Sequence, residues 1–583
     1  MFKLFKYLNW KEWIVLVLTL AFVAGQVWCN ISLPQCTLKI SEYLQSTPIA
    51  DYWTDIVMAC VEMLCYALGV VLCTIIAHYL SSYVVTNLLA RVRSNIFKKV
   101  NDFSEAEINK FSIPSLITRS TNDITQLQQV LTTTITLGLQ APLTAILAIV
   151  NIAQISVGSS AGQLSLVNVV SVIAICLVVS VIIFTVVPKF KKIQTATDGL
   201  NLVTRENLTG LKVVRAYSAE KTQEEKFDNV NKKYSKLSLF VDRVLAIIEP
   251  SLSFIMQGTS LAIVWIIGLL AGENPYLLTV MSAFSQYSIF IIMSFTSLSV
   301  LFMFVPRGIV SGRRINEILD TPISLKDGNG TEPTEKGTIS FKNVYFRYPD
   351  SDADVLENIS FDVKQGQTIA FIGSTGSGKS TLINLIPRFY DCSDGEILIN
   401  GVNVKDYTQH ELHDMIGYVP QKGILFSGTV AENIRYGKED ATDEEVKKAI
   451  EISQSDFVYN FPEGLDYHIS QGGKNVSGGQ KQRLSIARAI IKDPDILIFD
   501  DSFSALDYKT DKVVREKLNE AYKNTTKVIV AQRIGTIMNA DIIVVLNEGK
   551  IVGMGKHEEL LNSCDVYREI ALSQLSKEEL END

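Results

Sequence analysis

The sequence has few of the features that would tie it to metal, disulfide or nucleic-acid chemistry. Its eight cysteines are scattered, no two form a C-x-x-C pair, and most lie inside apolar runs. They read as small hydrophobic residues rather than as a zinc site or a disulfide framework. The net charge of -8 and the lack of a basic tail remove the electrostatic argument for nucleic-acid binding. We therefore expect no nucleic-acid partner.

The N-terminus also lacks a signal-peptide cleavage pattern, so the first apolar run is expected to stay in the protein. Cys29 and Cys36 flank a predicted outer loop, 34–52, and could pair in principle, but free thiols are the better interpretation.

Long hydrophobic runs, in contrast, are abundant. Hydrophobic residues make up 47% of the 583 residues and are concentrated before residue 305. A chain of this length exceeds one core, so several domains are expected. Six apolar stretches are each long enough to cross a bilayer, which takes about 20 residues. These predicted helices lie near 13–33, 53–80, 130–155, 164–187, 245–271 and 276–305.

The loops between these stretches fall into two groups that differ in their content of basic residues. The long loops 81–129 and 188–244 are rich in lysine and arginine, whereas the short loops 34–52, 156–163 and 272–275 hold one lysine, Lys39. Basic loops tend to stay inside the cell. The pattern predicts cytoplasmic termini and long loops, with helices that extend beyond the membrane. The abundant lysine, asparagine and isoleucine favour a bacterial plasma membrane.

A change in composition separates the membrane part, residues 1–320, from a second domain. Residues 321–337 contain a Gly-, Pro- and Asn-rich run and read as a linker. From residue 338 to 583, short apolar strands alternate with helical stretches, which predicts an α/β domain.

One motif organises this second domain. Residues 373–380 fit G-x-x-x-x-G-K-[ST], the phosphate-binding P-loop, and stand between a strand-like run and a helix-compatible run. Backbone N–H groups of such a turn surround phosphate oxygens. The lysine would reach the outer phosphates, and Ser380 would coordinate Mg²⁺. We predict ATP and Mg²⁺ binding by Gly373, Ser374, Thr375, Gly376, Ser377, Gly378, Lys379, Ser380 and Thr381.

Further motifs stand in order around the P-loop. They are Tyr345-Phe-Arg-Tyr-Pro349, Tyr418-Val-Pro-Gln421, Val476-Ser-Gly-Gly-Gln480, Ile496-Leu-Ile-Phe-Asp500 and Ser504-Ala-Leu-Asp507. With the six apolar stretches, this set resembles a half-size ABC exporter of the multidrug-resistance type over essentially the whole chain. Within the long loops, 116–123 and 204–217 look like the two coupling regions of that family.

The resemblance implies a role for each motif. Tyr348 would stack on adenine, Asp500 would hold Mg²⁺ as a Walker B aspartate, and Gln421 would contact the metal or the attacking water. The signature would complete the P-loop site of the opposite subunit, so two nucleotide domains are needed. We expect nucleotide contacts from Val476, Ser477, Gly478, Gly479, Gln480 and Asp507.

Two departures from the family stand in the catalytic positions. Asp501 follows Asp500 where competent members have glutamate, and Gln532 replaces their histidine. The aspartate carboxylate should fall about an ångström short of the attacking water, enough to cost ~10²-fold in rate. Glutamine can hydrogen-bond a phosphate but cannot become cationic. Gln471, where exporters usually have glutamate, is a milder change.

These departures favour the degenerate-site half of a heterodimeric exporter, paired with a half that carries the glutamate and histidine. A homodimeric lipid or drug flippase and an ATP-gated regulatory or channel subunit are the alternatives. An importer is disfavoured because importers normally keep the two domains on separate chains. The expected substrate is a hydrophobic or amphipathic drug, peptide or lipid.

Polar residues inside the apolar stretches are candidates for substrate contact, or for hydrogen bonds between helices. Glu62 lies well inside the second stretch, where a charge should face a cavity or a partner, and it is the better candidate for contact with a cationic substrate. Glu249 fits a headgroup-level position at least as well. The other candidates for a translocation path are Gln140, Gln257, Gln286 and Tyr287.

Overall fold

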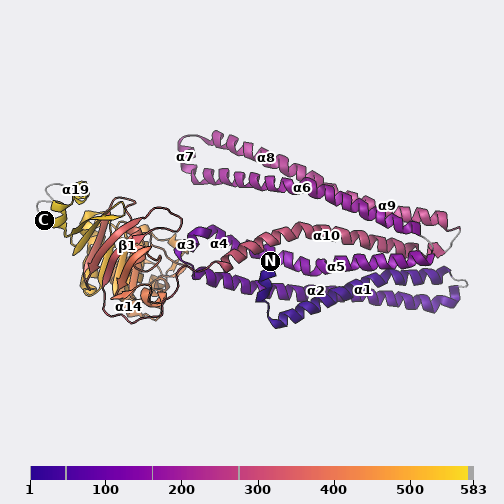
Figure 1. Ribbon diagram of the computed structural model, residues 1–583, viewed down its shortest axis with the longest axis horizontal. Coiled ribbons are helices and arrows are strands. Elements are labelled where there is room, and N and C mark those ends of the chain that lie inside the picture. Colours follow the sequence, from indigo (N-terminus) through magenta and orange to yellow (C-terminus); the bar gives the residue numbers. More distant parts are fainter. Residues whose placement is uncertain (1, 46–48, 160–161, 273–275, 575–583) are drawn as a thin grey trace. The chain divides into compact units, whose positions relative to one another are not determined.

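The computed structural model describes residues 2–45, 49–159, 162–272 and 276–574, and they form two compact units (Figure 1). The first unit contains the chain up to Asn101 together with Pro114–Thr321. The second contains Asp102–Ile113 together with the chain from Pro322 onward. The chain therefore passes between the units three times, after Asn101, after Ile113 and after Thr321.

The first unit is helical, and within the described residues six helical stretches are long and apolar enough to cross a membrane, which confirms the predicted number. Its elements are η1 (Phe2–Tyr7), α1 (Trp10–Gln45), η2 (Ile49–Tyr52), α2 (Trp53–Asn101), α4 (Ile113–Ser120), α5 (Asn122–Ser159), α6 (Gly162–Thr209), α7 (Leu211–Ala216), α8 (Glu220–Ala246), α9 (Ile248–Leu270) and α10 (Tyr276–Asp320).

These helices pack in long antiparallel pairs, α1 along α2, α5 along α10, and α6 along α8 and α9 (Figure 1). A shared apolar core joins α1, α5, α6, α9 and α10, and it includes Val27, Ile152, Ile263 and Phe284. In contrast, α2 exposes a row of large apolar side chains, among them Val61, Leu64, Leu68 and Leu72. Such a surface is unfavourable in water and is solvated by hydrocarbon.

Many hydroxyl groups inside these helices donate to a carbonyl of their own helix, although those of Ser81, Thr134 and Ser282 have no hydrogen-bond partner among the described residues. Thr19 Oγ1 donates to Val15 O over 2.8 Å, Ser171 Oγ to Val167 O over 2.7 Å, and Ser288 Oγ to Phe284 O over 2.8 Å. Each bond spans four residues, so a serine or threonine can lie in an apolar environment without an unpaired donor.

The first outer loop is shorter than predicted, because α1 continues through Pro34 to Gln45. Residues 35–45 are more polar than a membrane span, so hydropathy ended the predicted helix too early. Cys29 and Cys36 therefore both lie within α1, and the prediction that they flank a loop was wrong; both are free thiols. The extended end of α1 is joined to α2 by an ion pair, Lys39 Nζ to Glu62 Oε2 over 2.8 Å.

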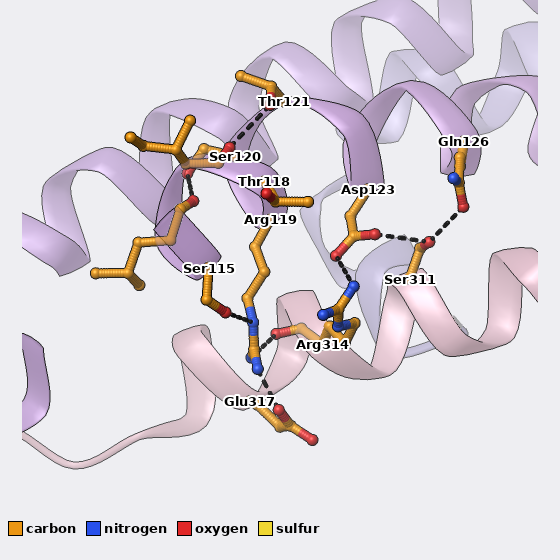
Figure 2. A network of polar contacts seen from close by, with 12 residues as sticks. Ser115, Thr118, Arg119, Ser120, Thr121, Asp123, Gln126, Ser311, Arg314 and Glu317 are labelled. Carbon is orange, nitrogen blue, oxygen red and sulfur yellow. Dashed lines mark hydrogen bonds and ion pairs between the residues drawn. The ribbon is translucent and has the colours of Figure 1, made fainter. Parts of the chain in front are cut away.

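A polar network joins α4 and α5 to the end of α10 (Figure 2). Arg119 Nη1 donates to Glu317 Oε2 over 2.8 Å and to Arg314 O over 2.9 Å. Asp123, 4% exposed, accepts from Arg314 Nη1 over 3.4 Å. Ser311 Oγ lies 3.1 Å from one Asp123 oxygen. The region 116–123, expected to be the first coupling region, is thus fastened within the first unit.

The segment of this loop that belongs to the second unit is instead α3 (Glu105–Phe111). Glu107 Oε2 accepts from Ser104 N over 2.8 Å, and Glu107 Oε1 accepts from Ser324 N over 3.2 Å. Ser104 and Glu107 form a capping box at the start of α3. The sequence signal was the S-x-x-E spacing, which marks a helix start.

The second unit is built on a six-stranded sheet with strand order β12-β11-β3-β10-β9-β6 and a four-stranded sheet with order β2-β1-β4-β5. The strands are β1 (Ile339–Phe346), β2 (Leu356–Val363), β3 (Thr368–Gly373), β4 (Asp394–Ile399), β5 (Val402–Asn403), β6 (Ile416–Val419), β7 (Gly428–Thr429), β8 (His468–Ile469), β9 (Ile496–Asp500), β10 (Thr526–Val530), β11 (Ile542–Asn547) and β12 (Lys550–Gly555). The helices are α11 (Lys379–Leu385), α12 (Gln409–Asp414), α13 (Val430–Arg435), α14 (Asp443–Ile452), α15 (Gly478–Ile490), α16 (Tyr508–Ala521), α17 (Ile534–Ile537), α18 (His557–Ser563) and α19 (Asp565–Leu572).

The middle of the larger sheet is parallel, with β3 beside β10, β10 beside β9, and β9 beside β6. All five residues of β9 and of β10 are buried. Parallel strands covered on both faces are mostly apolar for this reason, and here the polar members, Thr526, Lys527 and Asp500, lie at the strand ends. Their carboxyl ends meet at one edge of the sheet, which is where ligands bind in α/β folds of this kind.

Candidate functional site

Four predicted site segments meet at that edge, each directly after a parallel strand. The P-loop follows β3, Gln421 follows β6, Asp500 ends β9, and Gln532 follows β10. The topology thus gathers residues that are more than a hundred positions apart in the sequence.

The P-loop turns from β3 into α11 with glycines at positions that other residues rarely adopt. Gly376 and Gly378 have φ of 86° and 98°, in the region that favours glycine. At Gly373 (φ 154°), a Cβ would lie 2.0 Å from Leu546 O, so no side chain fits. The turn therefore requires glycine for backbone conformation and for close packing.

Lys379 directs its ammonium back into this turn. Nζ donates to Ser374 O over 2.7 Å, to Gly373 O over 2.9 Å and to Ser377 Oγ over 3.3 Å. Burial lowers the pKa of the Lys379 ammonium, and the nearby carboxylates of Asp501 and Asp500 oppose that shift. A cation held inside a glycine-rich turn is suited to binding an anion such as phosphate.

Ser380 and Asp500 bring two oxygen ligands together. Ser380 Oγ donates to Asp500 Oδ1 over 3.1 Å. Burial raises the pKa of the Asp500 carboxyl, and the neighbouring Asp501 adds to the rise. One hydroxyl and one carboxylate suit Mg²⁺, which keeps several waters and takes its other ligands from phosphates. Among the described residues, no group of three or more His, Cys, Asp or Glu side chains could hold a metal by itself.

Asp501 is held by two glutamine amides. Its Oδ2 accepts from Gln532 Nε2 over 2.8 Å and from Gln421 Nε2 over 3.2 Å. The residue is 6% exposed, its φ is 45°, and its N–H donates to Val530 O over 3.0 Å. A left-handed conformation at a non-glycine residue costs energy and often marks a functional site. The sequence showed the two substitutions but not that their side chains bond to each other.

Comparison with known proteins identifies the family. Residues 15–295 match the ABC transporter transmembrane region, and residues 356–504 match the ABC transporter family. An ABC transporter ATP-binding protein of Mycobacterium tuberculosis H37Rv is 38% identical over 511 residues, which cover 86% of this chain and 87% of the relative. The chain belongs to the ABC transporter family.

Two further comparisons are with exporters. A multidrug export ATP-binding/permease protein of Staphylococcus aureus is 36% identical over 368 residues, 63% of this chain and 64% of the relative. The solved structure of a bacterial Atm1-family ABC exporter has the same fold, with a TM-score of 0.78 and 23% identity over 97% of this chain and 100% of the other. The protein is a half-size ABC exporter, an integral membrane protein whose ATP-binding domain belongs to a class that couples ATP hydrolysis to transport.

In this exporter, Tyr348 lies beside the start of the P-loop helix. Its hydroxyl is 2.9 Å from Thr381 Oγ1, and its ring meets those of Phe346 and Tyr390 edge-on, at 4.9 and 5.3 Å between centroids. The side chain is only half-buried. These contacts fix an aromatic side chain at the P-loop, as stacking on adenine would require.

The exporter's signature forms the start of α15. Ser477 is the N-cap, its Oγ accepting from Gln480 N over 3.3 Å and its own N–H donating to Gln480 Oε1 over 2.8 Å. A Cβ at Gly478 would meet no atom within 4 Å, whereas Val476 is buried. Asp507 caps α16 by accepting from Thr510 N over 3.0 Å.

The polar candidates in the membrane helices lie in different environments. Glu62 is paired with Lys39 and so has a partner of its own. Tyr287 is 1% exposed and donates to Ile31 O over 3.1 Å, so it lies in the helix core and lines no path. Gln286 Nε2 lies 3.4 Å from Thr37 Oγ1. Glu249 and Gln257 are exposed, and Gln140 is partly buried.

Proposed function

We propose that this chain is the degenerate-site half of a heterodimeric ABC exporter, working with a different half that carries the catalytic glutamate and histidine. The observation that carries the proposal is the Asp501 carboxylate, which accepts hydrogen bonds from the amides of Gln532 and Gln421. Asp501 and Gln532, at the two catalytic positions, form a hydrogen bond with each other. Family members that hydrolyse ATP efficiently have glutamate and histidine at these positions.

The chemistry of those two side chains supports slow ATP hydrolysis at this site. A general base must reach within about 2.6–3.2 Å of the water it activates. Asp501 is one methylene shorter than glutamate, and Oδ2 is already an acceptor for two donors. Gln532 cannot supply a positive charge to the phosphate at any pH. ATP would therefore stay bound at this site for a long time, because its hydrolysis there is slow.

The residues needed to bind ATP are nevertheless present. Lys379 would contact the outer phosphates, Ser380 and Asp500 would hold Mg²⁺, and Tyr348 would stack on the base. The bound metal would neutralise charge on the phosphates, while Gln421 would sense whether the site is occupied. We assign ATP at this site a mainly structural part, holding two nucleotide domains together.

The signature is proposed to serve the other half. Residues Val476–Gln480 would cap the partner's P-loop, with the Ser477 hydroxyl and the backbone donors of Gly478 and Gly479 facing the γ-phosphate. Asp507 would lie at the same interface. Water would then attack the γ-phosphate at the partner's site, giving ADP and phosphate. Closure of the two domains would switch the membrane cavity from inward- to outward-facing.

The transported substrate is proposed to be hydrophobic or amphipathic, supported by the multidrug-type relative and by a membrane unit rich in apolar surface. The lysine and arginine distribution supports cytoplasmic termini, and the composition supports a bacterial plasma membrane.

Steady-state phosphate release tests the proposal, with this chain alone and with a half-transporter that carries the glutamate and histidine. The chain alone should be slow or inactive and the pair active. Gly478→Asp on this chain should abolish most turnover of the pair, because it places a charge at the signature without a packing clash. Gly535→Asp, at another position where a Cβ would meet no atom within 4 Å and φ is not positive, is the matched control.

Asp501→Ala should reduce turnover of the pair much less. If it is as damaging as Gly478→Asp, the degenerate-site proposal fails and a homodimer becomes the leading explanation. Rapid hydrolysis by this chain alone would favour the same homodimeric flippase. Turnover near zero with every partner would favour an ATP-gated regulatory subunit.

A further inference from the structure

A cavity of about 300 Å³ lies among α5, α6 and α10 in the membrane unit. Its lining is almost wholly apolar, and no charged side chain of the described residues contributes to it. The volume falls within the range of small-molecule sites, about 300–1,000 Å³. The residues lining the cavity are Ile149, Ile152, Ala153, Ser165, Asn168, Val169, Val172, Ile173, Ile291 and Phe295.

Asn168 is the unusual member of this lining. The residue is 7% exposed, and its buried amide Nδ2 has no hydrogen-bond partner among the described residues. The other polar member, Ser165, is satisfied, since its Oγ lies 2.8 Å from Ser156 Oγ. An unpaired amide donor in an apolar setting costs on the order of 1–3 kcal/mol. Because Asn168 lines the cavity, a bound acceptor that displaces the atoms now covering Nδ2 would remove this cost.

We propose that this cavity binds the exporter's substrate, and that the substrate is a neutral amphipathic molecule with a hydrogen-bond acceptor, such as a carbonyl or ether oxygen, that meets Asn168. The inference deepens the proposed function and rests on export of an amphipathic molecule. Neutrality follows from the uncharged lining, and from Glu62, whose charge is already matched by Lys39.

The acceptor follows from the position of the amide. A saturated acyl chain could fill the apolar volume but would leave Asn168 unpaired. A mostly apolar molecule that carries one hydrogen-bond acceptor can fill the cavity and also pair with the Asn168 amide. Because buried polar groups discriminate strongly between ligands that can and cannot pair with them, one amide can set selectivity in an otherwise featureless cavity.

The experiment measures saturable binding of Nile red, a neutral dye with a carbonyl acceptor, to the full chain in lipid nanodiscs without ATP. Rhodamine 6G serves as the cationic comparison. Asn168→Leu keeps the size of the side chain and removes the amide, and it should raise the Kd for Nile red about tenfold. Val172→Trp fills the cavity and should abolish saturable binding. Asn151→Leu, which removes an amide bonded to Gln35 outside the lining, is the control.

Thermal unfolding separates a binding role from a structural one. Asn168→Leu replaces an unpaired donor, so the melting temperature should stay level or rise while dye affinity falls. A lower melting temperature with unchanged affinity would overturn the proposal. So would equal binding of rhodamine 6G, or a bound phospholipid that Val172→Trp displaces, since the cavity would then be a lipid site. No hydrolysis is measured, so these outcomes are independent of the degenerate-site test.

Discussion

Gln532 Nε2 donates to Asp501 Oδ2 over 2.8 Å, joining the two residues on which the proposal of a degenerate site rests. The bond crosses from the segment after β10 to the residue after β9, and Gln421 donates to the same oxygen. The two substitutions therefore form one interacting pair. Changing either residue alone would leave the other without its partner.

Restoring both catalytic residues should raise hydrolysis more than restoring either one. We expect Asp501→Glu with Gln532→His to increase phosphate release by the chain alone on the order of 10²-fold, since both the reach of the base and a cation near the phosphate return. Each single change should increase phosphate release only slightly. Additive single effects would contradict the pairing. Gln471→Glu, away from this bond, is the control.

Lys379→Ala should sharply reduce photolabelling of this chain by an ATP analogue. The side chain supplies the cation of the P-loop, and its Nζ is held by oxygens of that turn. The exposed Lys512 on α16 offers a matched control, Lys512→Ala, which should label normally. Unchanged labelling of Lys379→Ala would remove the basis for its phosphate contact.

The ion pair of Glu62 and Lys39 should behave as a coupled unit. Glu62→Gln and Lys39→Met should each lower the melting temperature slightly, and the double variant should be no worse than either single one. Both side chains are partly exposed, so the effect is small, within about 1 kcal/mol. Selective loss of cationic substrates in Glu62→Gln, with Lys39→Met unaffected, would instead support direct substrate contact.

Asp123→Ala should loosen the network that joins α5 to α10. It removes a 4%-exposed acceptor for Arg314 and the Ser311 hydroxyl, at a cost of about 1–3 kcal/mol. Thermal unfolding in detergent measures the loss. Thr121→Ala, nearby and exposed, should have little effect. Equal melting temperatures for the two variants would show that the network adds no stability.

Attachment of α3 should depend on pH. Burial raises the pKa of Glu107, but hydrogen bonds from Ser104 and Ser324 outweigh it, so the pKa lies below its ordinary value. Its stabilising effect is therefore present above the unfolded-state pKa of about 4.3 and is lost as pH falls through the lower folded-state pKa.

Hydrogen exchange across α3 reports this attachment. Glu107→Gln at neutral pH should speed amide exchange there about tenfold and make it insensitive to acid. Lys110→Ala, an exposed position on the same helix, serves as the comparison. Exchange that accelerates equally in both variants would count against a specific role for the Glu107 carboxylate.

Local sequence patterns predicted the parts of this protein whose structure depends on residues close together in the sequence. The P-loop turn is fixed by glycines and its flanking strand and helix, and the membrane helices are fixed by long apolar runs. Contacts between distant segments were not predictable. Nothing near Glu62 pointed to Lys39 on another helix, and nothing near Tyr287 pointed to Ile31 O. The same limit applied to α3, whose neighbours in the second unit lie far along the chain.

The path of the chain between the two units has a consequence for proteolysis. Since the backbone passes from one unit to the other after Asn101, after Ile113 and after Thr321, three covalent connections join them. A single cut within residues 322–337 would leave Asp102–Ile113, which belongs to the second unit, covalently attached to the first unit, while the rest of the second unit would be held only by non-covalent contacts with that segment. A protease acting there should therefore produce two fragments on a denaturing gel that still elute as one particle under native conditions, held together by the packing of residues 102–113 within the second unit.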